Sequence, residues 1–110
     1  MTYQHKDLAA GRWSQLTFLE QMANIGSEVE RALNWLARNH QAYAQRAFER
    51  ALELLDLTLD GVRNPARLKE LARVRETMVD FFAGSNMYAS TDALWRKYFL
   101  PFTYAARRTR

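Results

Sequence analysis

The sequence predicts an all-α protein, folded as an antiparallel, up-down-up-down four-helix bundle. Three observations favour this class: four segments carry apolar residues at helical spacing, short joints containing Asn, Gly or Pro separate them, and no segment alternates apolar and polar residues as a strand does. The chain has 110 residues, 48% of them hydrophobic, which is enough for one modest core. We therefore expect a single domain over residues 1–110.

The first helix is expected over about residues 13–39, because no proline interrupts this stretch. Asp7 is an alternative, earlier N-cap unless Gly11 breaks the helix there. Gly26 falls on the apolar stripe of this helix. Since glycine inside a helix costs about 1 kcal/mol relative to alanine, we expect a neighbouring helix to approach the backbone closely at Gly26.

The second helix is expected over residues 41–60, which are rich in Ala, Leu, Glu and Arg. Gly61 follows it, and glycine tolerates the left-handed conformation that often ends a helix. The third helix is expected over residues 65–83, since Asn64 can cap it and the proline after Asn64 suits the first helical position. Gly84 then marks its end.

The fourth helix is expected over residues 91–107. Residues 90–92 are Ser-Thr-Asp, which places a hydroxyl cap before an acidic first turn. Pro101 lies inside this helix and is expected to kink it or to shift its hydrogen bonds. Residues 108–110 are expected to fray. Because the joints between helices are short, successive helices are expected to lie antiparallel.

Charge is distributed unevenly along the chain. The net charge of the chain is +4. Residues 1–60 hold six basic and eight acidic residues, a net charge of −2, whereas residues 61–110 hold ten basic and four acidic residues, a net charge of +6. The basic half indicates an anionic partner, unless it is only an Arg-rich solvated surface. Lys69 and Arg73 are expected to point into solvent, away from the core stripe of their helix. The cations expected to bind nucleic acid are Arg63, Lys69, Arg73, Arg96, Lys97, Arg107 and Arg108.

Three charged residues fall inside predicted apolar arcs. Arg67 and Arg75 lie within the arc of the third helix, and Glu30 lies within that of the first. A charge in such an arc is expected to snorkel to solvent or to pair with an opposite charge. We predict a partly buried pair between Glu30 and Arg75, with a structural rather than a catalytic role.

No catalytic residue, cofactor or metal site is expected. The second helix carries an acidic stripe with the donor chemistry of a metal site, formed by Glu49, Glu53, Asp56 and Asp60. A di-iron site in such a bundle needs Glu-x-x-His pairs, and neither His5 nor His40 follows a glutamate at that spacing. The stripe is thus expected to face basic residues or solvent. Helical toxin ribonucleases use an arginine followed, at a longer spacing, by a histidine. Here Arg38 lies only two positions before His40, so that motif is absent.

Several large apolar residues fall outside the predicted core stripes. Exposed apolar patches mark interfaces, so we expect self-association. The alternative is that terminal segments fold back over these residues. The predicted interface residues are Trp13, Trp35, Leu57, Leu100 and Tyr104.

No apolar stretch approaches the roughly 20 residues of a membrane-spanning helix. The first ten residues contain charged side chains and no apolar run, so no signal peptide is expected. The chain has no cysteine, and hence no disulfide or thiol chemistry. A cytoplasmic location is expected, with no membrane partner and no small-molecule substrate.

Six short segments of the chain are distinctive: residues 5–8, 11–13, 23–29, 47–54, 97–99 and 105–107, which read HKDL, GRW, ANIGSEV, AFERALEL, KYF and AAR. These segments resemble a group of small bacterial helical proteins without an assigned activity. By type, the chain is similar to the four-helix-bundle accessory proteins of diversity-generating retroelements and to the proteins encoded by ribosomal RNA intervening sequences. The similarity is one of size, helix count and charge, and no functional residue is carried over. It implies a basic ring that binds nucleic acid and a reverse transcriptase.

The first functional hypothesis is therefore a non-enzymatic, oligomeric helical bundle that binds nucleic acid or a nucleic-acid enzyme, such as a reverse transcriptase, as an accessory factor. The alternative is a helical protein–protein adaptor without nucleic-acid binding. A metal protein or enzyme built on the acidic stripe is the third hypothesis. Salt-dependent retention on RNA or DNA separates the first two, because phosphate contacts release counterions.

Overall fold

A computed structural model of the chain describes residues 11–108. All the regular structure within this range is helical, as the sequence predicts. The elements are a 3-10 helix, η2 (Trp13–Gln15), and four α-helices, α1 (Phe18–Ala37), α2 (Gln41–Gly61), α3 (Pro65–Ala83) and α4 (Asp92–Arg108). The number of α-helices agrees with the prediction, and several of their ends differ from it.

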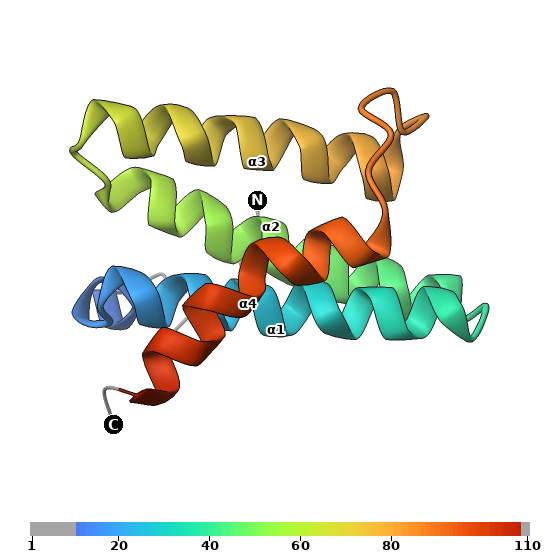
Figure 1. Ribbon diagram of the computed structural model, residues 1–110, viewed down its shortest axis with the longest axis horizontal. Coiled ribbons are helices and arrows are strands. Elements are labelled where there is room, and N and C mark those ends of the chain that lie inside the picture. Colours follow the sequence, from blue (N-terminus) through green and yellow to red (C-terminus); the bar gives the residue numbers. More distant parts are fainter. Residues whose placement is uncertain (1–10, 109–110) are drawn as a thin grey trace.

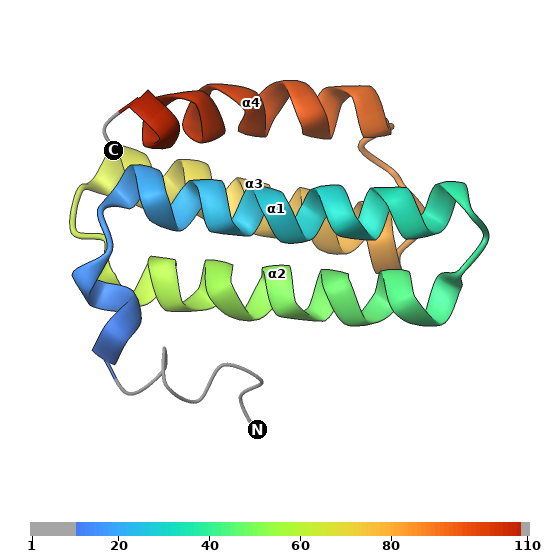
Figure 2. The same cartoon turned by 90° about the horizontal axis from the view of Figure 1, so that it is seen from below.

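The helices form a bundle that is open on one side. α1 packs on α2, α2 packs on α3, and α4 packs on α1. Figure 1 shows α4 crossing α1 obliquely, and Figure 2 shows α4 on the side of α1 that faces away from α2. α3 and α4 do not pack closely along their length, and a groove lies between them.

The start of α1 corrects the prediction of one helix over 13–39. Thr17 caps the helix: its hydroxyl accepts a hydrogen bond from the Glu20 amide at 3.1 Å, while the Glu20 carboxylate accepts one from the Thr17 amide at 2.9 Å. This reciprocal capping box satisfies two amides that lack helical partners, and it fixes the helix start at Phe18. The helix ends at Ala37. The alternative cap at Asp7 lies outside the described residues.

The joint between α2 and α3 confirms one predicted signal and corrects another. The Asn64 side chain accepts a hydrogen bond from the Arg67 amide at 3.1 Å, and a proline occupies the first helical position, as predicted. Gly61, however, is the last residue of α2 and has no positive φ; the extended residue Val62 follows it. Gly84 does end α3, but with an extended backbone. Neither glycine uses the left-handed conformation.

The start of α4 follows the predicted cap. The Thr91 hydroxyl accepts a hydrogen bond from the backbone amide three residues further on, at 3.2 Å. The helix covers Asp92–Arg108, against the predicted 91–107, and it continues through the exposed Pro101. Fraying was predicted for residues 108–110, but Arg108 is the last residue of α4, and residues 109–110 lie outside the described range.

Gly26 lies at a close contact between α1 and α4, as predicted. A Cβ atom added at Gly26 would lie 2.9 Å from the Cβ of Phe99 and 3.0 Å from its Cγ. Phe99 is itself buried, and its Cβ is fixed to the α4 backbone. The missing side chain at Gly26 therefore lets α4 seat an aromatic ring directly on the backbone of α1. The largest completely buried side chains of the protein, within residues 11–108, are Met22, Ile25, Val29, Leu55, Thr58, Leu71 and Met78.

Trp13 belongs to the core, which corrects its predicted place at an interface. Its side chain is 3% exposed, and its indole nitrogen donates a hydrogen bond to the hydroxyl of Thr58 at 3.0 Å. The Gln21 side chain also donates to the Trp13 carbonyl, at 2.9 Å. The first bond holds η2 against α2 and the second ties it to α1, so Trp13 is buried as part of a separate helical turn.

Candidate nucleic-acid interface

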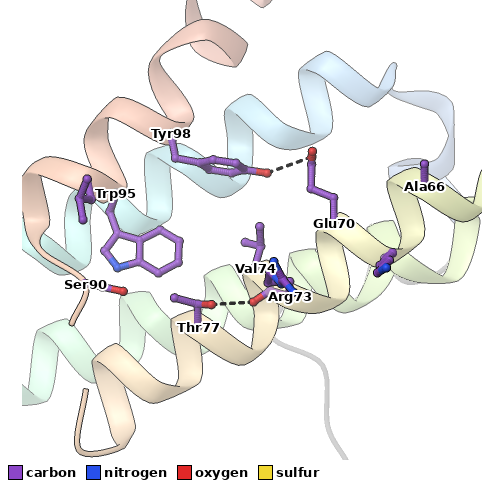
Figure 3. A pocket seen from close by; sticks show the side chains of 10 residues that line it. Ala66, Glu70, Arg73, Val74, Thr77, Ser90, Trp95 and Tyr98 are labelled. Atoms are coloured by element: carbon purple, nitrogen blue, oxygen red, sulfur yellow. Dashed lines mark hydrogen bonds between the residues drawn. The ribbon is translucent and has the colours of Figure 1, made fainter. Parts of the chain in front are cut away.

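A groove with a volume of about 540 Å³ lies between α3 and α4. Its walls combine apolar, aromatic and charged side chains from both helices (Figure 3). They are Ala66, Lys69, Glu70, Arg73, Val74, Thr77, Ser90, Leu94, Trp95 and Tyr98. The groove exists because α4 packs across α1 and leaves this flank of α3 uncovered.

A hydrogen bond between Tyr98 and Glu70 closes one part of the groove. The Tyr98 hydroxyl donates to the Glu70 carboxylate at 3.3 Å (Figure 3). Burial of the Tyr98 hydroxyl, and then the negative charge of Glu70, raise the pKa of Tyr98 above its ordinary value. The phenol is therefore neutral throughout the physiological range and serves as a donor.

The Trp95 ring forms the inner wall of the groove. Its side chain is 5% exposed, and it stacks against Phe99 with a ring separation of 6.3 Å. The indole nitrogen of Trp95 is buried and has no hydrogen-bond partner among the described residues. Figure 3 shows this nitrogen on the side of the ring that faces Ser90. Most buried donors in folded proteins are satisfied, so this one is an exception that needs an explanation.

Lys69 and Arg73 are exposed on α3, as predicted, but they line the groove instead of standing alone in solvent. Neither forms an ion pair with another residue in the range 11–108. They are one helical turn apart and therefore lie on the same face of α3. Two uncompensated positive charges thus flank an aromatic groove.

The predicted pair between Glu30 and Arg75 is wrong. Arg75 donates to both carboxylate oxygens of Asp56 on α2, at 2.7 and 3.4 Å, and this bond raises the pKa of Arg75. Glu30 instead accepts from Arg96 on α4. The reason is topological: α4, not α3, covers the Glu30 side of α1.

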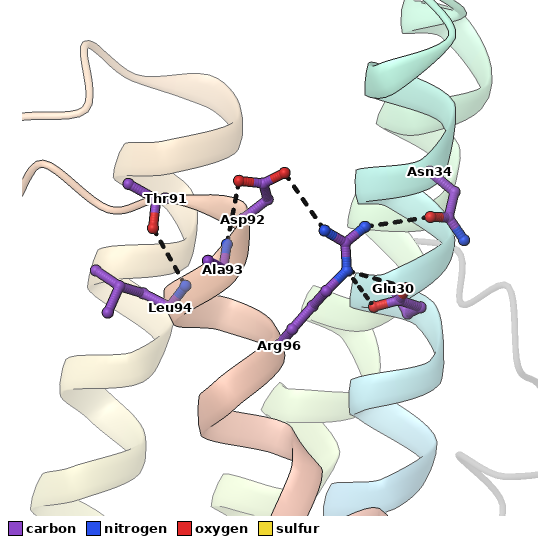
Figure 4. A network of polar contacts seen from close by, with 7 residues as sticks. All are labelled: Glu30, Asn34, Thr91, Asp92, Ala93, Leu94 and Arg96. Atoms are coloured by element: carbon purple, nitrogen blue, oxygen red, sulfur yellow. Dashed lines mark hydrogen bonds and ion pairs between the residues drawn. The ribbon is translucent and has the colours of Figure 1, made fainter.

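Arg96 was predicted to contact nucleic acid, but it is held within the protein. Its guanidinium forms ion pairs with Glu30 at 2.9 Å and Asp92 at 3.3 Å, and it donates to the Asn34 side chain at 3.2 Å (Figure 4). Two carboxylates compensate its charge. Arg96 therefore fastens α4 to α1 and is a poor candidate for a phosphate contact.

The other predicted cations are exposed but scattered. Arg63 lies in the joint after α2 and donates to the Asp60 carbonyl at 3.3 Å. Arg108 lies over the Tyr104 ring at 5.6 Å, while Lys97 and Arg107 are exposed on α4. Of the seven predicted residues, Lys69 and Arg73 line the α3–α4 groove, while Arg96 and Arg107 line a hollow of about 400 Å³ between α1 and α4, where Arg96 is already paired with carboxylates.

Two of the predicted interface residues are exposed and the others are not. Leu100 is 67% exposed and Tyr104 is 61% exposed. Leu57, in contrast, is half-buried against the core, and Trp35 packs on Tyr43 with a ring separation of 4.8 Å. Leu57 was wrongly placed because α2 is covered on more sides than a single apolar stripe suggests.

Sequence reasoning missed a further exposed leucine. Leu94 on α4 is 56% exposed and belongs to the groove wall. Around the axis of α4, Leu100 and Tyr104 lie on one face, and Leu94 lies roughly 120° from Leu100 and roughly 80° from Tyr104, so the three together cover about a third of the helix surface. That spacing was available in the sequence, and we call the surface formed by Leu94, Leu100 and Tyr104 the α4 ridge.

Within residues 11–108, the acidic side chains of α2 do not gather into a metal-binding cluster. Asp56 is paired with Arg75, and Glu49 accepts a hydrogen bond from the Gln45 side chain at 3.3 Å. Glu53 is buried, with 8% of its surface exposed. Over residues 11–108, no three acidic or histidine side chains come together in a way that could hold a metal. Nor is any described helix both long and apolar enough to cross a membrane.

No known family, curated protein sequence or solved structure matches this chain. The function must therefore be inferred from the groove, the charges around it and the α4 ridge.

Proposed function

We propose that the protein is a non-enzymatic accessory factor that binds nucleic acid through the α3–α4 face. One observation carries the proposal: Lys69 and Arg73 line the groove without a carboxylate partner, whereas Arg75 and Arg96 are compensated within the fold. Uncompensated cations on one face attract phosphates and release counterions when they bind. The second half of the chain, which holds both helices, carries the excess of positive charge.

Affinity on this basis is modest for a single chain. Phosphate contacts alone give dissociation constants of roughly 10⁻⁴ to 10⁻⁶ M at physiological salt. An assembly of several chains would multiply the contacts and tighten binding through avidity. A nucleic-acid enzyme such as a reverse transcriptase fits the same proposal as a second partner, held beside its template.

The proposal is tested by fluorescence anisotropy with a labelled 20-nucleotide strand at 50 to 200 mM salt. Lys69→Gln and Arg73→Gln are each expected to weaken binding for every sequence and to flatten the salt dependence by about one unit per lost contact. Arg75→Gln is the matched control, because it removes the same charge two residues away from Arg73 but at a side chain paired with Asp56. Arg75→Gln is expected to weaken nucleic-acid binding less than either Lys69→Gln or Arg73→Gln.

Two results would contradict nucleic-acid binding: no detectable affinity at 50 mM salt, or equal losses for Arg73→Gln and the Arg75→Gln control. Equal losses would mean that net charge alone acts, without a localised site.

The α4 ridge supports a second proposal, self-association, or adaptor function towards another protein. Leu100 and Tyr104 expose large apolar surfaces on one helix, and such surfaces mark interfaces. The antiparallel up-down-up-down order is part of this proposal and is supported by the short connections at 38–40 and 62–64. The ridge borders the groove at Leu94, so both surfaces can act in one assembly.

A further inference from the structure

We infer that the α3–α4 groove holds an unpaired base, so that the protein prefers single-stranded nucleic acid to a duplex. The inference rests on the proposed function and adds to it the form of the nucleic acid and the way it is bound.

The shape and lining of the groove suit a base. At about 540 Å³, the groove falls within the usual size of ligand pockets, roughly 300 to 1,000 Å³. Trp95 and Tyr98 supply aromatic surface, and Val74 and Leu94 supply apolar surface. A base in a duplex is stacked and paired and cannot enter such a groove, whereas an unpaired base has a free face for aromatic contact.

The unpaired indole nitrogen of Trp95 favours a polar occupant over an apolar one. A buried donor without a partner is unfavourable, and an aliphatic side chain in the groove would leave it unpaired. Bases carry carbonyl oxygens and ring nitrogens that accept hydrogen bonds. The nitrogen is shielded from solvent in the free protein, so a base can accept a hydrogen bond from it only if the Trp95 ring turns within the groove.

The charges fit a strand that passes along the α3 rim. Lys69 and Arg73 lie one turn apart and can contact phosphates on either side of the inserted base. Glu70 is the one acid in the groove wall, and its carboxylate is engaged by the Tyr98 hydroxyl. The strand therefore follows Lys69 and Arg73 and not the Glu70 side.

The test compares three labelled probes of equal length: a mixed-sequence DNA 15-mer, its duplex, and a 15-mer of abasic sites. Base–aromatic contact is expected to favour the single strand over the abasic strand by about tenfold. Trp95→Phe keeps a ring but removes the indole donor, and it is expected to reduce that preference several-fold. Trp35→Phe is the matched control, since Trp35 lies outside the groove, and it is expected to change nothing.

The outcomes separate the two claims. If the single strand, duplex and abasic strand bind alike and all depend on Arg73, nucleic-acid binding stands and the base-in-groove inference is overturned. If none of the probes binds, both fall. Should Trp95→Phe misfold by circular dichroism, Leu94→Ser at the exposed groove wall replaces it, and it must weaken the single strand more than the abasic strand. Unchanged binding by a folded Leu94→Ser variant would also overturn the inference.

Discussion

The backbone of Gly26 and the side chain of Phe99 are so close that a Cβ at position 26 would lie 2.9 Å from the Cβ of Phe99. The distance is shorter than van der Waals contact, and the clashing atom is attached to the α4 backbone. The contact therefore couples the sequence of α1 to the position of α4, and hence to the width of the α3–α4 groove.

Gly26→Ala is expected to lower the free energy of unfolding despite the better helix propensity of alanine. Overpacking typically costs about 1–3 kcal/mol, against a propensity gain of about 1 kcal/mol. Gly26→Leu is expected to cost more. Urea denaturation followed by circular dichroism measures both.

Gly61→Ala is the control for this pair. Nothing lies within 4 Å of a Cβ at Gly61, and its φ is not positive, so alanine is expected to leave stability unchanged or to raise it by up to about 1 kcal/mol. If Gly26→Ala were as stable as Gly61→Ala, the close contact would not constrain α4.

The sequence located the helices well because their ends carry local signals. Asn64 and Thr91 are caps whose side chains bond to amides three residues away, and such bonds need no knowledge of the tertiary fold. The start of α1 was missed for a different reason. The Thr17–Glu20 capping box is also local, but an unbroken apolar pattern from Trp13 onward concealed it.

The candidate site was harder to predict, because it depends on which helix covers which. A helical projection gives the direction of Glu30 and Arg75 around their axes but not the helix that each one meets. It showed Lys69 and Arg73 facing outward, and both are exposed. It could not show that α4 crosses α1 and leaves a groove beside these two residues.

The buried hydrogen bond from Trp13 to Thr58 is expected to stabilise the fold through η2. Thr58→Val leaves the indole nitrogen of Trp13 buried without its acceptor, at a cost of about 1–3 kcal/mol. Trp13→Phe removes the donor. If the hydrogen bond couples the two residues, the double variant will lose less free energy of unfolding than the two single variants lose together. A double-mutant cycle of urea denaturation measures this difference. Additive losses would assign the role of Trp13 to packing alone.

Tyr98 is expected to make stability fall at high pH. Because burial and Glu70 raise its pKa in the folded protein, the folded state keeps the phenol proton more tightly than the unfolded chain, where the pKa is about 10. The contribution of the neutral hydroxyl is fully present below pH 10 and is lost as the pH rises above that value towards the folded-state pKa. Urea midpoints between pH 9 and 11 are expected to fall less steeply in Tyr98→Phe than in the parent.

A Tyr98→Phe variant with the parental slope would mean that Tyr98 does not titrate differently on folding.

Self-association through the α4 ridge is expected to depend on Leu100 and Tyr104. Sedimentation velocity at micromolar concentrations should give a mass above the 12.9 kDa of one chain, and Leu100→Ser with Tyr104→Ser should shift it towards that value. Burial of these exposed side chains on association would supply the driving force, which serine removes.

Tyr43→Ser is the matched control, because Tyr43 is also an exposed tyrosine, 47% exposed, with an arginine over its ring. Tyr43 lies on α2, away from the ridge, so the mass distribution of the Tyr43→Ser variant should match that of the parent protein. A parent protein that stays at 12.9 kDa throughout would rule out self-association and leave the ridge to a different protein partner.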